Sequence, residues 1–231
     1  MEIGGLQKTT LIDYPGKIAT TVFLMGCNFR CPFCYSTELV LPAKMKNQPK
    51  ISQADFFNFL KRKKDLLDGV VVCGGEPTIH QDLPEFVKEI KKLGFLVKLD
   101  TNGSNPEMLE KLIRRKLLDY IAMDIKAPKE KYDFLSGAKD SVAKIERIIN
   151  LLKKEKIEYE FRTTVAPGLL KEDILKIVKW ISPARRYFLQ EVKLDKEIIN
   201  PKIKTLPLLS RSDIERIVRE IKPEFKACKV R

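Results

Sequence analysis

Short apolar runs alternate with amphipathic runs along most of this 231-residue chain. The apolar runs are rich in β-branched residues and predict buried strands, and the amphipathic runs have the 3.6-residue period of helices with one buried face. We expect strands over 18–25, 69–73, 95–100, 118–126, 159–165 and 187–192. We expect helices over 52–64, 83–93, 106–116, 141–156, 171–181 and 210–221. Six strand-then-helix units predict an α/β fold with parallel strands and right-handed crossovers, in either an open doubly wound sheet or a partial β/α barrel.

The amino-acid composition limits the classes of protein to which this chain can belong. Apolar residues make up 44% and charged residues 32% of the chain, which excludes wholesale disorder and suits one large domain. No window approaches about 18 uncharged apolar residues, so we expect no membrane-spanning helix. The first ten residues lack the basic flank and apolar run of a signal peptide, which favours a cytoplasmic protein. The net charge of +13 comes from basic residues spread over many segments, which favours a Lys-rich solvated surface over a nucleic-acid-binding arm.

Polar and metal-binding groups recur at or near the C-terminal ends of the expected strands. They are Cys27, Gly74–Gly75–Glu76, Asp100–Thr101–Asn102–Gly103, Asp124–Lys126, Arg162 and Gln190. In parallel β/α folds that edge of the sheet carries the active site. The placement therefore favours an enzyme over a purely structural protein.

Three of the five cysteines lie close together, with the spacing C-x3-C-x2-C: Cys27, Cys31 and Cys34. Thiolates are soft ligands that suit zinc or iron–sulfur clusters. A structural zinc site needs four ligands, and His80 is the only histidine. Three thiolates on an iron–sulfur cube would leave the fourth iron open for chemistry. The favoured interpretation is an iron–sulfur cluster with one open iron. One alternative is a zinc site in which His80 is the fourth ligand. The other is three core thiols that bind no metal.

The remaining cysteines, Cys73 and Cys228, stand alone in the sequence. Cys73 ends an apolar run and is expected to be a small buried hydrophobe. Cys228 lies in a basic tail and has no expected role. Two separate cysteines make a second cluster improbable, and His80 is expected to lie in a loop.

The stretch 26–35, together with the GGEP of Gly74–Pro77, resembles the radical S-adenosylmethionine (SAM) superfamily. The opening GGLQKTTLIDYPGKIATTVFLMGCNFRCPFCYS is similar to activating proteins of anaerobic ribonucleoside-triphosphate reductase, relatives of pyruvate formate-lyase activating enzymes. The similarity runs from about Gly5 to Gln190. It implies a single radical SAM domain over 1–231, with an N-terminal extension (1–17), a partial (β/α)6 barrel (18–192), and a C-terminal helix and tail (193–231).

The resemblance also implies cofactors and partners. Cys27, Cys31 and Cys34 would hold one [4Fe–4S] cluster, whose open iron is chelated by SAM. Reductive cleavage of SAM gives methionine and a 5′-deoxyadenosyl radical, which takes a hydrogen atom from a glycine Cα of a partner enzyme. The partners would be a glycyl radical enzyme and an electron donor such as flavodoxin or ferredoxin. No catalytic side chain is expected beyond the cluster and the SAM site.

Family analogy places two strand-end segments against SAM. Gly74 and Gly75 would let the backbone approach the ligand, with the Glu76 carboxylate facing the SAM ammonium; the alternative is an ordinary turn. Asp100, in a segment with Thr101 and Asn102, would hydrogen-bond the SAM amino or ribose groups; the alternative is a helix N-cap.

Two further strand ends would carry the SAM carboxylate site. Period-2 alternation puts Asp124 and Lys126 on one face, with Lys126 toward that carboxylate, and Arg162 would reach the same group. The alternatives are an Asp124–Lys126 ion pair and a structural pair between Arg162 and an acidic neighbour. Asp100, Thr101 and Asp124 could also hold a monovalent cation, as in the pyruvate formate-lyase activators.

Three residues are implied near the nucleoside. Phe33 would pack near adenine or shield the cluster, and backbone groups of Tyr35 would read the base. Gln190 stands where pyruvate formate-lyase activators carry a histidine. Glutamine forms hydrogen bonds and does not titrate, so contact is expected and acid–base chemistry is not.

Two other functions remain open at this level. A radical SAM enzyme acting on a small molecule, such as a deazapurine precursor, would use the same cofactors, but no set of polar residues enclosing a small substrate stands out in the C-terminal third. A zinc-containing nucleic-acid-binding module would need a fourth ligand and a basic face with aromatic residues, and neither is visible.

Overall fold

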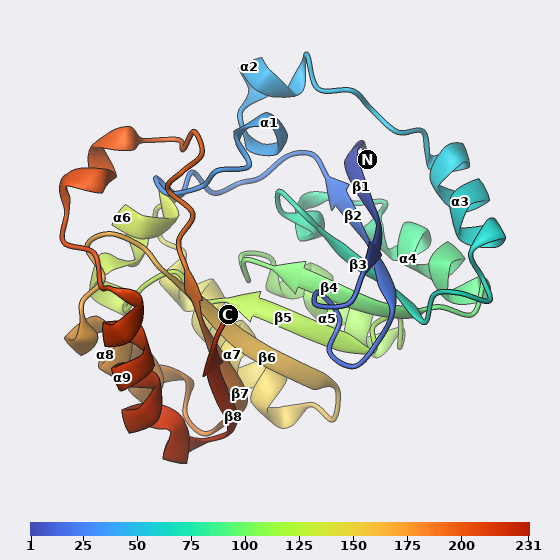
Figure 1. Cartoon of the computed structure of the whole chain (residues 1–231). Helices are drawn as coiled ribbons and strands as arrows, with labels where there is room; N and C mark the ends of the chain where they lie inside the picture. Colours follow the sequence, from blue (N-terminus) through green and yellow to red (C-terminus); the bar gives the residue numbers. More distant parts are fainter. The chain divides into compact units, whose positions relative to one another are not determined.

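A computed structural model describes all residues, 1–231, with eight strands and nine α-helices (Figure 1). The strands are β1 (Ile3–Thr10), β2 (Ala19–Leu24), β3 (Gly69–Gly74), β4 (Leu96–Thr101), β5 (Tyr120–Asp124), β6 (Glu158–Val165), β7 (Ala184–Glu191) and β8 (Phe225–Val230). The helices are α1 (Thr37–Val40), α2 (Pro42–Met45), α3 (Gln53–Arg62), α4 (Leu83–Lys92), α5 (Pro106–Arg114), α6 (Tyr132–Ser136), α7 (Val142–Lys154), α8 (Lys171–Ile181) and α9 (Arg211–Ile221). Short 3-10 helices are η1 (Pro77–Ile79), η2 (Lys129–Lys131), η3 (Pro201–Thr205) and η4 (Lys222–Glu224).

The six predicted strands and six predicted helices are all present, as β2 to β7 and as α3, α4, α5, α7, α8 and α9. The strands follow one another in the sheet in the order in which they occur along the chain. β2 pairs in parallel with β3, β3 with β4, β6 with β7 and β7 with β8, whereas β1 is antiparallel to β2. Parallel neighbours align their carboxyl ends, so the residues that follow them share one edge.

The chain forms two compact units. The first consists of Met1–Asn28, Glu38–Thr101 and Asn105–Ile121, and the second of Phe29–Thr37, Asn102–Ser104 and Ala122–Arg231. β5 is shared, because its first two residues belong to the first unit and its last three to the second.

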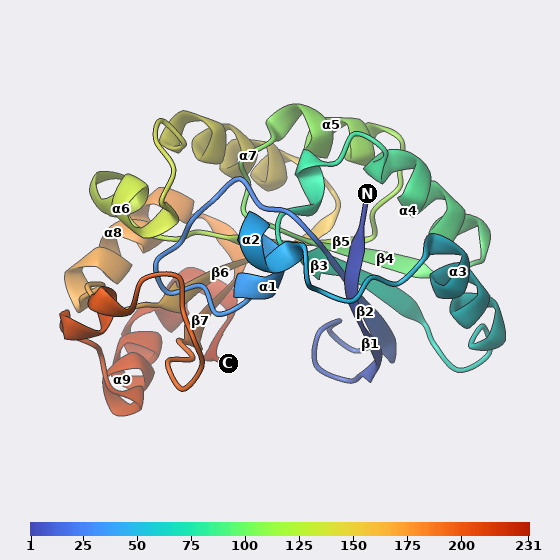
Figure 2. The same cartoon turned by 90° about the horizontal axis from the view of Figure 1, so that it is seen from above.

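Apolar strands and helix faces make the core of the first unit. Val70, Val71 and Val72 of β3 are completely buried, and burial of each valine stabilises the fold by about 1.5 kcal/mol or more. Figure 2 shows α4 and α5 along the same side of the unit's parallel strands. Phe56 of α3 stacks on Phe86 of α4, with ring centroids 5.4 Å apart. The Ser52 hydroxyl caps α3, since it accepts the Asp55 N–H at 3.0 Å.

In the second unit, α7, α8 and α9 pack with the unit's own strands. α7 buries Ile145, Ile148, Ile149 and Leu152, and α9 buries Ile214, Ile217, Val218 and Ile221. Both sets have the i, i+3, i+4, i+7 spacing of one helix face. Between the strands, the Tyr187 hydroxyl of β7 donates a 2.9 Å hydrogen bond to Thr163 Oγ1 of β6.

Two strands lie in segments predicted as an extension and a tail. β1 reads IGGLQKTT, whose adjacent glycines weaken the strand pattern, and β8 reads FKACKV in a basic stretch. Each is defined by pairing with a neighbouring strand. Cys228 lies buried in β8, where burial raises the pKa of its thiol to about 11. None of the helices is long and apolar enough to span a bilayer.

Candidate active site

The cysteine segment begins directly after β2. The Gly26 N–H donates to the Leu39 carbonyl at 2.8 Å, and Gly26 has a left-handed φ of +93°, which turns the chain out of the strand toward Cys27. Cys27 belongs to the first unit, while Cys31 and Cys34 belong to the second. None of the three forms a disulfide, and Cys31 is buried whereas the other two are half-buried.

In the second unit, two segments distant in sequence hold the loop around Cys31 and Cys34. The carbonyl of Ser136, the last residue of α6, accepts the Arg30 N–H at 2.9 Å and lies 3.6 Å from Cys31 Sγ. On the other side, the Ile199 N–H donates to the Cys34 carbonyl at 3.0 Å. The Asn200 N–H donates to the Pro32 carbonyl at 2.9 Å. Neither segment was predicted to contact the cysteine loop, because backbone hydrogen bonds leave no side-chain signal in a sequence.

The two aromatic residues of this loop differ in exposure. Phe33 is buried, whereas Tyr35 is 40% exposed. The ammonium groups of Lys193 and Lys196 lie 5.7 and 5.3 Å from the centre of the Tyr35 ring. The loop thus buries the ring of Phe33 and leaves the ring of Tyr35 at the surface, beside two lysines.

The GGE turn after β3 packs against the end of β2. The Gly75 N–H donates to the Leu24 carbonyl and the Glu76 N–H to the Gly26 carbonyl, both at 2.8 Å. A Cβ on Gly75 would lie 1.9 Å from the Gly26 carbonyl oxygen. The glycines therefore allow the two strand ends to approach each other, a requirement within the chain itself that holds whether or not a ligand is bound.

Replacing Gly75 with alanine is therefore expected to lower the free energy of unfolding by at least about 2 kcal/mol, because the overlap involves backbone that cannot rotate away. Chemical denaturation monitored by circular dichroism measures this. The matched control is Gly5→Ala, whose new Cβ would meet only Phe23 Cδ2 at an ordinary 3.4 Å. Equal stability of the two variants would contradict the close approach.

The Glu76 carboxylate is completely buried in the first unit. Its Oε1 accepts hydrogen bonds from the Thr78 N–H at 3.0 Å, the Thr78 hydroxyl at 2.5 Å and the Thr101 hydroxyl at 2.7 Å. The carboxylate thus caps η1 and ties the end of β3 to the end of β4. These bonds fix its orientation at the strand-end edge.

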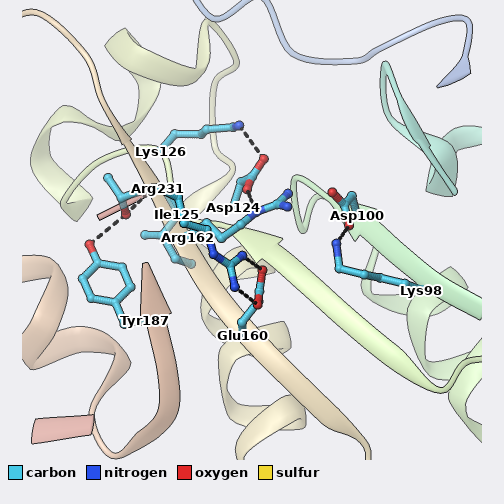
Figure 3. A network of polar contacts seen from close by, with 10 residues as sticks. Lys98, Asp100, Asp124, Ile125, Lys126, Glu160, Arg162, Tyr187 and Arg231 are labelled. Atoms are coloured by element: carbon cyan, nitrogen blue, oxygen red, sulfur yellow. Dashed lines mark hydrogen bonds and ion pairs between the residues drawn. The ribbon is translucent and has the colours of Figure 1, made fainter. Parts of the chain in front are cut away.

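The end of β4 carries an ion pair that the sequence analysis missed. Lys98 is 1% exposed and its ammonium bonds Asp100, which lies two residues further along the same face of the strand (Figure 3). A lysine inside an apolar strand is the sequence signal that could have revealed the pair, since buried lysines are rarely found unpaired. Next to it, Thr101 is buried.

Asn102 is buried in the second unit, where its Oδ1 accepts the Ser104 N–H at 2.9 Å. Asn102 and Ser104 both precede α5, but neither of them is its N-cap. That position belongs to Asn105, whose side chain accepts the Met108 N–H at 3.2 Å.

Asp124 lies between two cations in the second unit. Arg162 Nε donates to Asp124 Oδ1 at 2.8 Å, and Lys126 Nζ donates to Oδ2 at 3.0 Å (Figure 3). The Ile125 N–H donates to the Arg162 carbonyl at 2.8 Å, which aligns the two segments. Both ion pairs were alternatives in the sequence analysis. They do not exclude ligand binding, because two cations on one carboxylate leave the trio with one excess positive charge.

The charges of this trio shift its titration. Burial alone would raise the pKa of Asp124, but the nearby Arg162 and Lys126 outweigh it and hold that pKa well below its usual range. Burial alone would lower the pKa of Lys126, but Asp124 reverses this and raises it. All three groups are therefore charged at neutral pH.

A second pair lies deeper on the same face of β6. Glu160, two residues before Arg162, is completely buried and receives a bidentate contact from Arg231, with Nη1 to Oε1 at 2.7 Å and Nη2 to Oε2 at 3.1 Å (Figure 3). The Arg231 guanidinium also lies 3.6 Å from the centre of the Phe188 ring. The sequence analysis missed this pair, since nothing in the sequence indicates that the residue after β8 returns to β6.

The remaining predicted residues have less distinctive surroundings. Gln190 is half-buried near the end of β7, where it is the strand partner of Thr164. His80 lies after η1 in the first unit, with Nε2 2.9 Å from the Met25 carbonyl oxygen, and burial lowers its pKa.

Neither unit assembles three or more His, Cys, Asp or Glu side chains around a point where one metal ion could sit.

The donor set fits an iron–sulfur cluster. In a cube each thiolate binds its own iron, so three sulfurs need not converge on one point as the ligands of a single zinc must. Cys27, Cys31 and Cys34 form no disulfide, and each belongs to an irregular segment held by backbone hydrogen bonds.

Comparison with known proteins gives the family. The profile of the Radical SAM superfamily matches residues 21–181, from β2 to the end of α8. The chain belongs to the radical SAM superfamily. Members of this family use a [4Fe–4S] cluster and SAM, and the α/β fold with its parallel strands is the fold predicted above. This assignment decides against a zinc-containing nucleic-acid-binding module.

Relatives place this radical SAM protein among the activating enzymes of glycyl radical enzymes. It is 34% identical over 223 residues to a Methanocaldococcus jannaschii protein provisionally named a glycyl-radical enzyme activating enzyme, a match covering 93% of this chain and 89% of the relative. It is 35% identical over 125 residues to the pyruvate formate-lyase-activating enzyme of Listeria monocytogenes, covering 50% and 49%. The structure of Streptococcus suis SuiB bound to S-adenosylmethionine is similar in fold, with a TM-score of 0.64, 16% identity and coverage of 90% and 51%.

Proposed function

We propose that this radical SAM activating enzyme generates a glycyl radical on an anaerobic ribonucleoside-triphosphate reductase. The observation that carries the proposal is the cysteine spacing at the end of β2 within a chain of this family. The similarity of the segment from Gly4 to Ser36 to the reductase activators favours this partner. When bound and reduced, the cluster would supply the electron that cleaves SAM and so produces the radical that removes a glycine Cα hydrogen.

Cys27, Cys31 and Cys34 would hold the cluster, and the Asp124 trio would bind the SAM carboxylate. The trio carries two cations for one carboxylate, so an added anion neutralises its excess charge. Asp124 would act by positioning, because its two oxygens fix Lys126 and Arg162 relative to each other. The site is preorganised by these ion pairs, because Lys126 and Arg162 are already held in position before the ligand binds.

The ammonium and the nucleoside of SAM would meet the other strand ends. The glycine turn of Gly74 and Gly75 would present the Glu76 carboxylate to the ammonium, and Asp100 would bond the amino or ribose groups. The other proposed contacts are Phe33, Tyr35, Thr101, Asn102 and Gln190. A monovalent cation at Asp100, Thr101 and Asp124 stays a prediction.

The proposal also covers the domain organisation, the cellular location and the electron donor. We expect the chain to act as a single radical SAM domain over 1–231 in the cytoplasm. Its electron donor would be a flavodoxin or a ferredoxin.

The test is anaerobic incubation of the cluster-loaded protein with SAM, a reductant and an anaerobic ribonucleoside-triphosphate reductase, followed by electron paramagnetic resonance. A glycyl doublet on the reductase is the expected result. A reductase whose radical-bearing glycine is replaced by alanine is the matched control and should give no doublet. SAM cleavage without a doublet would overturn the choice of partner. Cleavage with no radical on any glycyl radical enzyme would favour a small-molecule substrate, such as a deazapurine precursor.

A further inference from the structure

Two buried hydroxyls in the second unit, those of Tyr132 and Ser182, lack a hydrogen-bond partner in the structure. Tyr132, the first residue of α6, is completely buried, and its hydroxyl donates no hydrogen bond within the chain. Tyr187 is equally buried in the same unit, but its hydroxyl donates to Thr163 Oγ1 at 2.9 Å. An unsatisfied buried hydroxyl costs about 1–3 kcal/mol and is rare in native proteins, so the exception calls for an explanation.

The helix that carries Tyr132 is fixed against the second cysteine. Ser136 lies one turn after Tyr132 on the same helix face, and its carbonyl accepts the Arg30 N–H and contacts Cys31 Sγ. Gly137 follows with a left-handed φ of +63°, and a Cβ there would lie 2.3 Å from the Arg30 carbonyl oxygen. The end of α6 is therefore in close backbone contact with the segment that leads into Cys31.

The ring of Tyr132 is held on another side by Trp180 of α8. The two rings meet edge to face with centroids 6.0 Å apart. Packing of this kind fixes the plane of the ring and therefore where the hydroxyl points. A fixed ring with an unsatisfied hydroxyl leaves that group available to a partner absent from the polypeptide alone.

The electrostatic surroundings agree with this placement. Burial raises the pKa of the Tyr132 hydroxyl far above its ordinary value, so the group stays protonated at neutral pH. The charge and backbone of Lys126 oppose the shift, whereas negative charge on Cys31 or Asp124 adds to it. An ammonium and a backbone N–H can only donate, so Lys126 does not accept the hydroxyl proton. Both oxygens of Asp124 already accept bonds from Lys126 and Arg162.

We propose that Tyr132 is a positioning residue of the cluster site, whose hydroxyl donates a hydrogen bond to the Cys31 thiolate once the cluster is bound. The inference rests on the proposed function, because only cluster binding turns the Cys31 thiol into a strong acceptor. A hydrogen bond to a cluster sulfur stabilises the reduced, more negative state and therefore raises the reduction potential. Tyr132 would in this way make the electron transfer that precedes SAM cleavage easier.

The test compares Tyr132→Phe with the matched variant Tyr187→Phe, using the reduction potential of the reconstituted cluster in the absence of SAM. For Tyr132→Phe we expect reduction to be disfavoured by about three- to tenfold, where tenfold corresponds to 59 mV for one electron. Its cluster-free form should keep the wild-type melting temperature or exceed it, since the hydroxyl donates no hydrogen bond within the chain. Tyr187→Phe should leave the potential unchanged and lower the melting temperature, because it loses the bond to Thr163.

Three results would overturn the inference in a loaded protein. They are an unchanged potential in Tyr132→Phe, a shift that develops only after SAM is added, and a cluster-free Tyr132→Phe protein as destabilised as Tyr187→Phe. A wild-type protein that takes up no cluster would be a different failure, because it would overturn the proposed function itself.

Discussion

Replacing Cys31 with alanine is expected to abolish the iron–sulfur cluster and SAM cleavage while the fold survives, and the same result is expected for Cys27→Ala and Cys34→Ala. Each thiolate would bind a different iron, so the loss of one leaves a corner of the cube without a protein ligand. We expect SAM cleavage to fall by more than about a hundredfold, beyond the effect of changing a residue that only supports a ligand. Iron content, visible absorbance and methionine release after anaerobic reconstitution measure the outcome.

The matched control is Cys73→Ala, which removes a half-buried thiol on β3 outside the motif. It should keep the cluster and SAM cleavage. Circular dichroism of every variant checks the fold, which draws its stability from the apolar strands and helix faces. Normal SAM cleavage in any one of the three motif variants would remove that cysteine from the cluster site.

Replacing Asp124 with alanine is expected to lower the free energy of unfolding by about 3 kcal/mol, because it removes the carboxylate shared by Lys126 and Arg162. The two cations are 13% and 11% exposed, so water cannot fully replace the lost partner. Denaturant unfolding at pH 7 measures the effect. Glu85→Ala is the control, because it breaks a surface pair with Arg115 in which the glutamate is 62% exposed, and it should change stability little.

The same carboxylate predicts a pH dependence. The pKa of Asp124 is lower in the folded protein than in the unfolded chain, so its contribution to stability is complete above about pH 4 and declines as the pH falls toward the folded value. Asp124→Asn lacks this contribution at every pH. The stability difference between the wild type and Asp124→Asn should therefore be constant near neutrality and shrink below about pH 4. A difference that grows on acidification would contradict the direction of the shift.

The sequence was most informative where one residue type or a periodic pattern carries the chemistry. The β-branched runs specify β2 to β7, because local propensity and burial agree over each of them. The cysteine spacing and the GGEP segment indicate the superfamily without any coordinates. Glu76, Asp100 and Asp124 lie at or next to the ends of β3, β4 and β5 as predicted, whereas Arg162 lies within β6.

The sequence was least informative where a residue is defined by a partner far away in the chain. The Glu160–Arg231 pair, whose partners are 71 residues apart in the sequence, was missed, and Arg231 left no signal in the sequence. The GGE turn was predicted to face the ligand, and nothing in the sequence indicated that Gly75 is also required by its backbone contact with Gly26. Contacts of this kind depend on which segments become neighbours after folding.

By itself, the sequence determined the alternation of strands and helices, the cysteine motif and the family, because each depends on spacing along the chain. Only the tertiary structure decided that Asp124 is shared by Lys126 and Arg162, that Ser136 and Asn200 hold the cysteine loop, and that the Tyr132 hydroxyl is left without a partner. The physical reason is that hydrogen bonds and ion pairs act over about 3 Å in space, whereas the residues that form them can be separated by any length of chain.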